Sequence, residues 1–463
     1  MKLTYNVQDK PGLGKTIVFA FQQLLAILAA TIAVPAIVGN GMSQSAALFG
    51  AGVGTLVYLL FTKFRSPVFL GSSFAFLGSM FAAFSGAYAE SALGHLGLII
   101  GAVFAGLVYV VIAIIVKCVG VKWINKVMPA VVIGPTVAII GLSLAGNAIR
   151  DAVGASAGFT TFDQSALLNG NGYIFNMSLK GWIALICALV TLIVVIICSV
   201  YGKKMMKMIP FIIGIVAGYI VAAIFTVIGN ATGNAALQII DFSKFSAMQW
   251  VPAFTIGKAI NGFEALKSDP SYIATIAVAY VPVGFVVFAE HLADHKNLSS
   301  IIEKDLLEEP GLHRTLLGDG IGSMAGAFFG GCPNTTYGEA IGCVAISGNA
   351  SVVTSVATAL LAIAASFVAP FTTFLATIPA CVMGGVCITL YGFIAVSGLK
   401  MLQKVDLNEN SNLFTASVIL IAGIGSMALQ IGKVKLTAIA CALILGIIVN
   451  LIVKKARKAE EDK

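Results

Sequence analysis

The chain has 463 residues, of which 59% are hydrophobic and only 10% are charged. Because soluble domains carry about 25% charged residues, this composition excludes a soluble protein and predicts an all-α protein that crosses the lipid bilayer many times. The net charge of +8 does not indicate a nucleic-acid partner, since most basic residues fall where loops would face the cytoplasm.

Apolar runs long enough to be transmembrane helices recur along the chain. The run that begins near Ile17 lacks a signal-peptide cleavage site, so we expect a retained first helix. The approximate limits of the first seven predicted spans are residues 14–38, 46–62, 67–84, 94–116, 128–148, 181–200 and 208–229. The next seven are residues 272–292, 316–330, 334–347, 350–368, 374–397, 413–429 and 435–453.

The third and tenth spans are poor helix formers. The third contains FLGSSFAFLG, and the tenth contains GGCPNTTYGEAIG, which begins at Gly330. Two polar stretches, residues 149–179 and 230–271, interrupt the spans, and the second separates two halves of seven spans each. Two halves with a broken third span predict an inverted repeat of the kind found in secondary transporters. The alternative is a coincidence between two small-residue packing segments.

The basic residues set the expected orientation. With a cytoplasmic N-terminus, the inside segments hold 21 of the 28 Lys and Arg residues. This bias follows the positive-inside rule. It also supports an even number of spans, with both termini in the cytoplasm.

A few carboxyl groups fall within apolar spans. Glu290 follows a long uncharged run, Asp294 lies one turn later on the same helix face, and Glu339 lies in the broken tenth span. A charge at the bilayer centre costs roughly 2.5–3.5 kcal/mol, so these residues are functional candidates. Asp319, which opens the ninth span, is expected to be an interfacial or capping group. The alternative for Asp294 is a structural pair with one of its basic neighbours, which are His291, His295 and Lys296.

These carboxyl groups suit two tasks. A carboxyl group that gains and loses a proton as the protein changes shape would couple transport to a proton gradient. When protonated it donates a hydrogen bond, and when ionised it only accepts. A planar ligand with alternating N–H and C=O groups would therefore suit Glu290 and Glu339, with amides of the broken spans beside them. Phe74 offers an aromatic face for stacking, and the alternative is that it packs in the core.

No pattern indicates an enzyme, a metal site or a cofactor. The eight cysteines form no CxxC pair, and no His/Cys spacing suits zinc. We find no nucleophile–base pair and no phosphate-binding loop.

Six segments together resemble the nucleobase–ascorbate transporter (nucleobase:cation symporter-2) family, and within it the bacterial uracil permease branch. The resemblance extends from about residue 10 to 450. The segments are QQLLAILAATIAVP, FLGSSFAF, VVFAEHLADH, EKDLLEEPGLHRTLLGDGIGSM, PNTTYGEAIG and PACVMGGVCITLYG.

The resemblance implies a fold and a function. The fold would have fourteen segments in two inverted seven-segment repeats, with short β-strands in the third and tenth segments. A core domain (residues 12–122 and 270–370) would move against a gate domain (residues 123–269 and 371–455), and gate domains would form a homodimer. The function would be proton-coupled uracil symport into the cell across the bacterial inner membrane.

The resemblance also implies roles for individual residues. Glu290 and Glu339 would hydrogen-bond the pyrimidine, and Phe74 would pack on it. Asp294 would take part in proton coupling with these two carboxyl groups. The remaining implied site-lining residues are Ala30, Tyr337, Gly338 and Tyr391.

Two positions depart from a close relative of the family. Gln23 stands where that relative has a histidine, so any proton role there is lost or moved. Ala340 follows Glu339 where that relative has asparagine, which affects substrate fit. The wording PNTTYGE favours uracil over oxidised purines.

Other functions stay open at this stage. The same fold would serve for xanthine or another nucleobase, and sodium would serve as the coupling ion. An anion transporter of the related fourteen-segment sulfate-transporter architecture is a second class, although two acidic residues in the site argue against an anion. A membrane enzyme is the third class.

Overall fold

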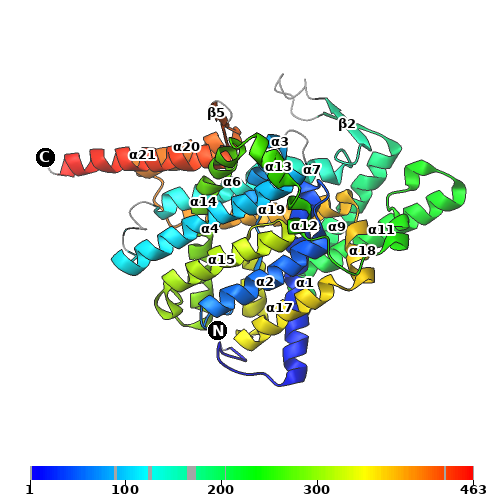
Figure 1. The fold of residues 1–463 in the computed structure, drawn as a ribbon, viewed down its shortest axis with the longest axis horizontal. Coiled ribbons are helices and arrows are strands. Elements are labelled where there is room, and N and C mark those ends of the chain that lie inside the picture. Colours follow the sequence, from blue (N-terminus) through cyan, green and yellow to red (C-terminus); the bar gives the residue numbers. More distant parts are fainter. Residues whose placement is uncertain are drawn as a thin grey trace. The chain divides into compact units, whose positions relative to one another are not determined.

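The computed structural model describes residues 3–87, 91–121, 123, 128–163, 174–203, 205–431 and 434–461. Most of these residues are helical, as the ribbon shows (Figure 1). The chain divides into two compact units, which are described separately. Unit 1 comprises residues 1–143, 252–364 and 393–463, and unit 2 comprises residues 144–251 and 365–392.

Eight helices among the described residues are long and apolar enough to cross a membrane. They are α1 (Leu13–Val38), α2 (Gln44–Phe61), α4 (Ser91–Val119), α6 with α7 (Ala130–Ser143 and Ala145–Ala152), α9 (Leu179–Tyr201), α11 (Pro210–Thr232), α14 (Tyr272–Ile302) and α19 (Ala380–Leu402). Helices α17 (Val352–Ser366) and α18 (Ala369–Thr377) meet at a bend of 82° and would form a ninth span if they act together. The protein is therefore a multi-pass membrane protein, as its composition predicts.

The other predicted spans coincide with helices outside this group of eight. These helices are α3 (Leu77–Gly86), α15 (Leu312–Gly330), α16 (Gly338–Ser347), α20 (Asn410–Ile424) and α21 (Ala438–Glu461). The inverted repeat of fourteen segments stays a prediction, because these helices are not among those that are both long and apolar enough to cross a membrane. The core and gate boundaries also stay a prediction, because a compact unit is not necessarily a unit that moves.

Short elements of unit 1 connect its long helices. They are β1 (Leu70–Ser72), η1 (Phe74–Phe76), α12 (Thr255–Ala259), α13 (Gly262–Ser268), η4 (Leu307–Gly311), β4 (Asn334–Thr336), β5 (Leu429–Ile431) and β6 (Val434–Leu436). Strands β1 and β4 lie in the third and tenth predicted spans, so both spans are interrupted as the Gly, Ser, Thr and Pro residues there indicate.

Unit 2 contains the first polar stretch that the sequence places between spans and the second one up to Val251. Its short elements are β2 (Thr160–Asp163), β3 (Ile174–Met177), α10 (Met205–Met208), η2 (Ala235–Leu237) and η3 (Phe242–Ala247). Strands β2 and β3 form an antiparallel pair, which sequence reasoning did not predict. Helices α9 and α11 pack together, and the first part of α19, up to Gly392, belongs to this unit.

Helices α2 and α15 of unit 1 pack with their backbones in close contact. A Cβ atom on Gly54 would lie 2.7 Å from the carbonyl oxygen of Gly322, and one on Gly322 would lie 2.6 Å from that of Gly54. Small residues let membrane helices approach in this way. We call the contact the glycine seam, defined by Gly50, Gly54, Gly322 and Gly326.

The glycine seam also holds strand β4. The Asn334 side-chain amide donates to the carbonyl oxygen of Gly50 at 3.1 Å. The same side chain fills the space that a Cβ atom on Gly54 or Gly326 would occupy. Packing between two helices thus fixes the start of the strand that leads into the tenth span.

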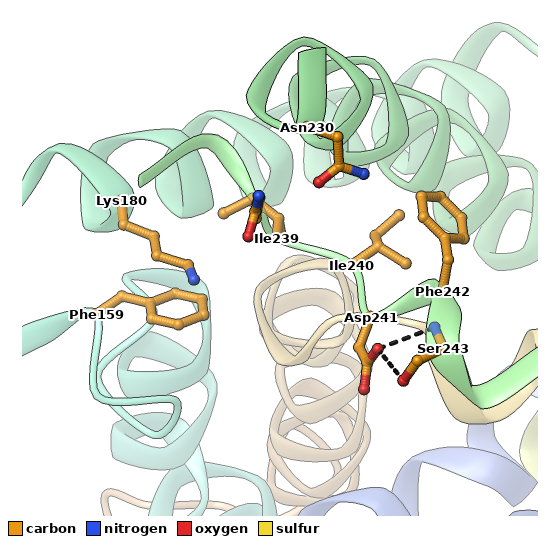
Figure 2. Close-up of a pocket in the computed structure, with 9 residues that line it drawn as sticks. Phe159, Lys180, Asn230, Ile239, Ile240, Asp241, Phe242 and Ser243 are labelled. Carbon is orange, nitrogen blue, oxygen red and sulfur yellow. Dashed lines mark hydrogen bonds between the residues drawn. The ribbon is translucent and has the colours of Figure 1, made fainter. Parts of the chain in front are cut away.

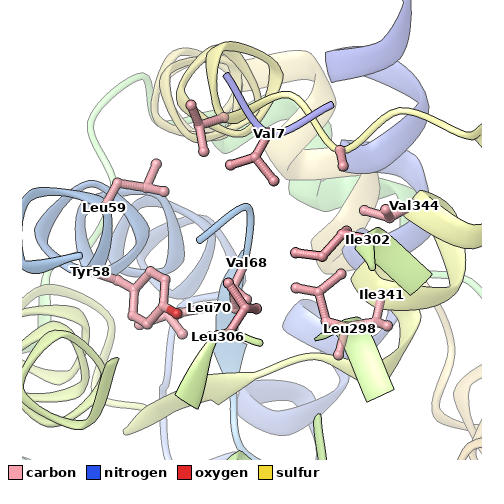
Figure 3. Packing of buried hydrophobic residues seen from close by; sticks show 12 residues of the cluster. Val7, Tyr58, Leu59, Val68, Leu70, Leu298, Ile302, Leu306, Ile341 and Val344 are labelled. Atoms are coloured by element: carbon pink, nitrogen blue, oxygen red, sulfur yellow. The ribbon is translucent and has the colours of Figure 1, made fainter. Parts of the chain in front are cut away.

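A hydrophobic cluster in unit 1 joins residues far apart in the sequence (Figure 3). Val7, from the N-terminal segment, is 4% exposed and packs with side chains such as Tyr58 of α2 and Leu298 of α14. The segment is held by backbone bonds from Ala350 N–H to the Tyr5 carbonyl at 2.9 Å and from Val352 N–H to the Val7 carbonyl at 3.0 Å. Burying a side chain of this size contributes about 1.5–3 kcal/mol to stability. The cluster therefore helps to hold the N-terminal segment against unit 1.

The glycine seam gives a direct test of the fold. Gly54→Ala places a methyl group against the Gly322 carbonyl, and overpacking of this kind costs about 1–3 kcal/mol. The melting temperature of the purified protein in detergent should fall. The matched control is Gly78→Ala, because a Cβ atom there meets nothing within 4 Å. Equal melting temperatures for the two variants would show that the seam is not tightly packed.

Candidate substrate-binding site

The two interrupted spans meet through an antiparallel strand pair, β1 with β4. Leu70 lies opposite Thr336, and beyond the pair the Ser73 N–H donates to the Pro333 carbonyl at 2.9 Å. An unpaired backbone amide costs several kcal/mol in hydrocarbon. The pairing therefore satisfies the non-helical backbone of both spans.

Each strand leads into the beginning of a helix. Strand β1 continues into η1 and α3, and β4 continues through Tyr337 into α16, whose first turn holds Gly338 and Glu339. The first N–H groups of a helix have no partner within it, and the helix dipole makes this end attractive to hydrogen-bond acceptors. Transporters commonly build substrate sites from such broken helices.

Tyr337 binds one strand to the other through its side chain. Its hydroxyl donates to the Ser72 carbonyl at 2.8 Å, and the side chain is 4% exposed. Its ring lies against Gly71, where a Cβ atom would lie 2.8 Å from the hydroxyl oxygen and closer still to ring carbons. Glycine at position 71 is thus required by the position of the Tyr337 ring.

The three predicted carboxyl groups lie together beside these strands. Helix α14 contacts α16 and β4, and electrostatic interactions connect Glu290 with both Asp294 and Glu339. Asp294 and Glu339 also interact with each other. All three side chains are partly exposed. The structure thus brings together residues that are 45 to 49 positions apart in the sequence.

Most of the other predicted site residues also lie in unit 1. Phe74 opens η1 and is 7% exposed, whereas Gly338 is exposed at the start of α16. Ala30 is buried on α1, a helix that packs against β1 and α16. Tyr391 is buried in unit 2, so its place in the site stays a prediction.

Gln23, which stands where a close relative has a histidine, has a polar partner on a neighbouring helix. It is 5% exposed on α1, and its Oε1 lies 3.0 Å from Oγ1 of Thr358 on α17. The glutamine thus connects two helices of unit 1.

Asp319 is not the interfacial or capping group that the sequence suggested. It lies in the middle of α15, is 1% exposed, and its Oδ2 is 2.7 Å from Nδ1 of His291. His291 therefore pairs with Asp319 and not with Asp294, whose Oδ2 accepts a hydrogen bond from the Thr336 hydroxyl at 2.6 Å. Position along an apolar span does not show which helix faces which, so the pair could not be predicted.

The hydrogen bonds of His291 determine how many protons this pair shares. The Thr315 hydroxyl lies within hydrogen-bond distance of both the Leu312 carbonyl and Nε2 of His291, at 3.0 Å each. When this hydroxyl donates to the carbonyl, it accepts from Nε2, which then carries a hydrogen. In this arrangement one further proton lies between His291 Nδ1 and Asp319, and the pair has no net charge.

A second histidine anchors α14 one turn later. His295 Nδ1 donates to the His291 carbonyl at 2.8 Å, which leaves Nε2 to accept from the Tyr58 hydroxyl at 2.7 Å. The Tyr58 oxygen lies 2.7 Å from Oγ of Ser66. The spacing of four between the two histidines was the sequence signal that they share a helix face. This face binds α2 and α15, while Glu290 and Asp294 lie on the neighbouring face.

Comparison with known proteins identifies the family. The model of a permease family (Xan_ur_permease) matches residues 14–432. The chain belongs to this family.

Curated relatives match the permease over almost its whole length. It is 39% identical to a uracil permease of Bacillus caldolyticus, with 100% of this chain and 97% of the relative covered. It is 35% identical to a uracil permease of Bacillus subtilis (100% and 98% covered) and 33% identical to one of Escherichia coli K12 (97% and 94% covered). These relatives are permeases, which are transport proteins and not enzymes.

Solved structures resemble the permease in fold. The transmembrane domain of a cyanobacterium bicarbonate transporter, BicA, has a TM-score of 0.63 at 16% identity and covers 97% of this chain and 98% of its own. Murine Slc26a9, an anion transporter, has a TM-score of 0.63 at 12% identity, with 97% of this chain and 69% of that chain covered. At such low identity the likeness concerns the fold alone.

An open pocket of about 510 Å³ lies in unit 2 of the permease (Figure 2). Lys180 and Phe159 line one side, where the Lys180 ammonium lies 4.2 Å from the ring centroid, and Asp241 accepts hydrogen bonds from Ser243 on the other. None of the sequence-predicted site residues lines it.

Gly71 provides a test of the site's geometry. Gly71→Ala would push the Tyr337 ring from its place and loosen the strand pair, so transport should fall at least tenfold. Uptake of radiolabelled nucleobase into proteoliposomes measures the effect, with protein amount matched. Gly342→Ala is the control, because a Cβ atom there meets nothing within 4 Å. Normal uptake by Gly71→Ala would contradict the described packing of Tyr337.

Proposed function

We propose that the permease takes up uracil together with protons, across the inner membrane of a bacterial cell and by alternating access. The curated relatives support the substrate: three proteins named uracil permease match this chain over almost their whole length at 33% to 39% identity. Both termini would lie in the cytoplasm, in keeping with the distribution of Lys and Arg residues.

The observation that carries the proposal is the group of three carboxyls beside the strand pair. Uracil has N–H and C=O groups in alternation around its ring. Glu290 and Glu339 would bind these groups, since a carboxyl accepts from N–H in either state and donates to C=O when protonated. Phe74 would pack on the ring, and the backbones of Ala30, Tyr337 and Gly338 would line the site with Tyr391.

The same carboxyls supply a reason for proton coupling. Glu290, Asp294 and Glu339 interact electrostatically, so charge on one disfavours charge on the others. A proton that binds among them lowers this repulsion and completes the hydrogen bonds to the base. Binding of substrate and binding of a proton would thus favour each other. The Asp319–His291 pair stays neutral in this scheme.

Alternating access would move the core domain (residues 12–122 and 270–370) against the gate domain (residues 123–269 and 371–455). The predicted inverted repeat would supply two related arrangements of the halves, as in known secondary transporters. Gate domains of two copies would form a homodimer.

The proposal predicts that uptake depends on a proton gradient. Proteoliposomes with an acidic exterior should accumulate radiolabelled uracil, and dissipation of the gradient with a protonophore should abolish accumulation. Excess unlabelled uracil should compete more strongly than xanthine. Equal accumulation with the gradient dissipated would rule out proton coupling. Accumulation that follows a sodium gradient would identify sodium as the coupling ion instead. Stronger competition by xanthine would show that uracil is not the preferred substrate.

The role of Glu339 in substrate binding can be tested with a substitution that keeps the shape of the side chain. Glu339→Gln removes the charge and the exchangeable proton, and hydrogen bonds to charged groups contribute about 1.5–3 kcal/mol. Uracil binding, measured by calorimetry, should weaken by roughly ten- to a hundredfold. Glu308→Gln makes the same change at an exposed position and should leave binding unchanged. Normal binding by Glu339→Gln would remove Glu339 from the site.

A further inference from the structure

Thr336 connects the predicted proton-coupling residue to the strand pair. It is the last residue of β4, it is 1% exposed, and its hydroxyl donates to Asp294 Oδ2 at 2.6 Å. The next residues in the chain are Tyr337, Gly338 and Glu339, which the proposed function places at the substrate. One hydrogen bond therefore lies between Asp294 and the backbone that would contact the base.

The other side of this connection is held in place. Helix α14, which carries Asp294, is bound to α15 through His291 and Asp319 and to α2 through His295 and Tyr58. Strand β4 pairs with β1 over three residue pairs, and Asn334 fixes its start to the glycine seam. A change in the Asp294–Thr336 bond therefore acts on the other end of the strand, where the chain leads into Tyr337.

The bond must change when Asp294 binds a proton. A hydrogen bond to an ionised carboxylate is roughly twice as strong as one between neutral groups. A protonated Asp294 also has a hydrogen of its own to donate, and the Thr336 oxygen is an available acceptor once its hydroxyl rotates. A change in the charge of Asp294 therefore changes a hydrogen bond that holds the last residue of β4.

We propose that Thr336 is a positioning residue that couples the protonation of Asp294 to the conformation of the substrate site. The inference rests on the proposed function, because it assigns Asp294 to proton coupling. Other titratable groups interact with Asp294 and would titrate with it: Glu290 on its own helix, Glu339 on α16, Asp319 on α15 and Tyr109 on α4. The effect of Thr336 must therefore be separated from theirs by changing the hydroxyl alone.

Two substitutions isolate the hydroxyl. Thr336→Val keeps the branched shape that suits a strand and removes the donor, whereas Thr336→Ser keeps the donor and loses only a methyl group. Thr335→Val removes a hydroxyl from the opposite face of the same strand. Each variant is compared with the wild type by size-exclusion chromatography for folding and by uracil uptake between pH 5 and 9.

We expect Thr336→Val to move the pH profile of uptake to higher pH by about one unit, a tenfold change in proton binding. The sign follows because the lost donor favoured the ionised carboxylate. Thr336→Ser should keep the wild-type profile, and Thr335→Val should keep it as well. An unchanged profile in Thr336→Val would overturn the inference, and so would an equal shift in Thr335→Val.

A double-mutant cycle with Thr336→Ala, which also removes the hydroxyl, covers the case in which Thr336→Val folds poorly. Asp294→Asn removes the titrating group, so Thr336→Ala added to Asp294→Asn should change uracil binding by the same factor at every pH. A pH-dependent effect of Thr336→Ala on binding that persists without Asp294 would overturn the coupling. Failure of the proposed function is distinguishable, because wild-type protein would then show no proton-dependent uracil uptake at all.

Discussion

The antiparallel pair of β1 and β4 is the constraint on which the rest of unit 1 depends. A chain that leaves the helical conformation inside a membrane must find partners for its backbone amides, and here each broken span supplies them to the other. The pair needs close support, which the glycine seam between α2 and α15 provides. Asn334 fills the space that the glycines leave, and Tyr337 closes the pair over Gly71. The position of Glu339 therefore depends on the hydrogen bonds of the strand pair and on the helix packing that supports it.

Helix α14 has two faces with different tasks. One face carries His291 and His295, whose bonds to Asp319 and Tyr58 fix the helix to its neighbours without net charge. The neighbouring face carries Glu290 and Asp294, which stay partly exposed beside β4. A helix that is held on one side can present carboxyl groups at a defined position on the other. This division explains how a membrane protein tolerates four ionisable residues within two turns of one helix.

Much of the arrangement could be predicted from sequence, because composition and apolar run length specify membrane spans directly. The clusters of Gly, Ser and Thr marked both broken spans, and the scarcity of charge made Glu290, Asp294 and Glu339 conspicuous. The Asp319–His291 pair could not be predicted, because helices that are apolar on all sides give no signal of which faces meet. The β2–β3 strand pair was missed because its strands are short and lie in a polar stretch. The sequence indicated a break between the spans 350–368 and 374–397, but not the separate short helix α18 (Ala369–Thr377) that lies across this break.

In the proposed function a substrate and a proton bind to the same group of carboxyls, so that binding of one favours binding of the other. The most direct measurement is the number of protons exchanged when uracil binds to the purified permease. Calorimetric titrations in buffers of different ionisation enthalpy give this number without any membrane or gradient. We predict net proton uptake on binding near neutral pH, and a smaller uptake when Asp294, which is not assigned a bond to the base, is replaced by asparagine. Tight uracil binding with the same enthalpy in every buffer across the pH range would contradict it.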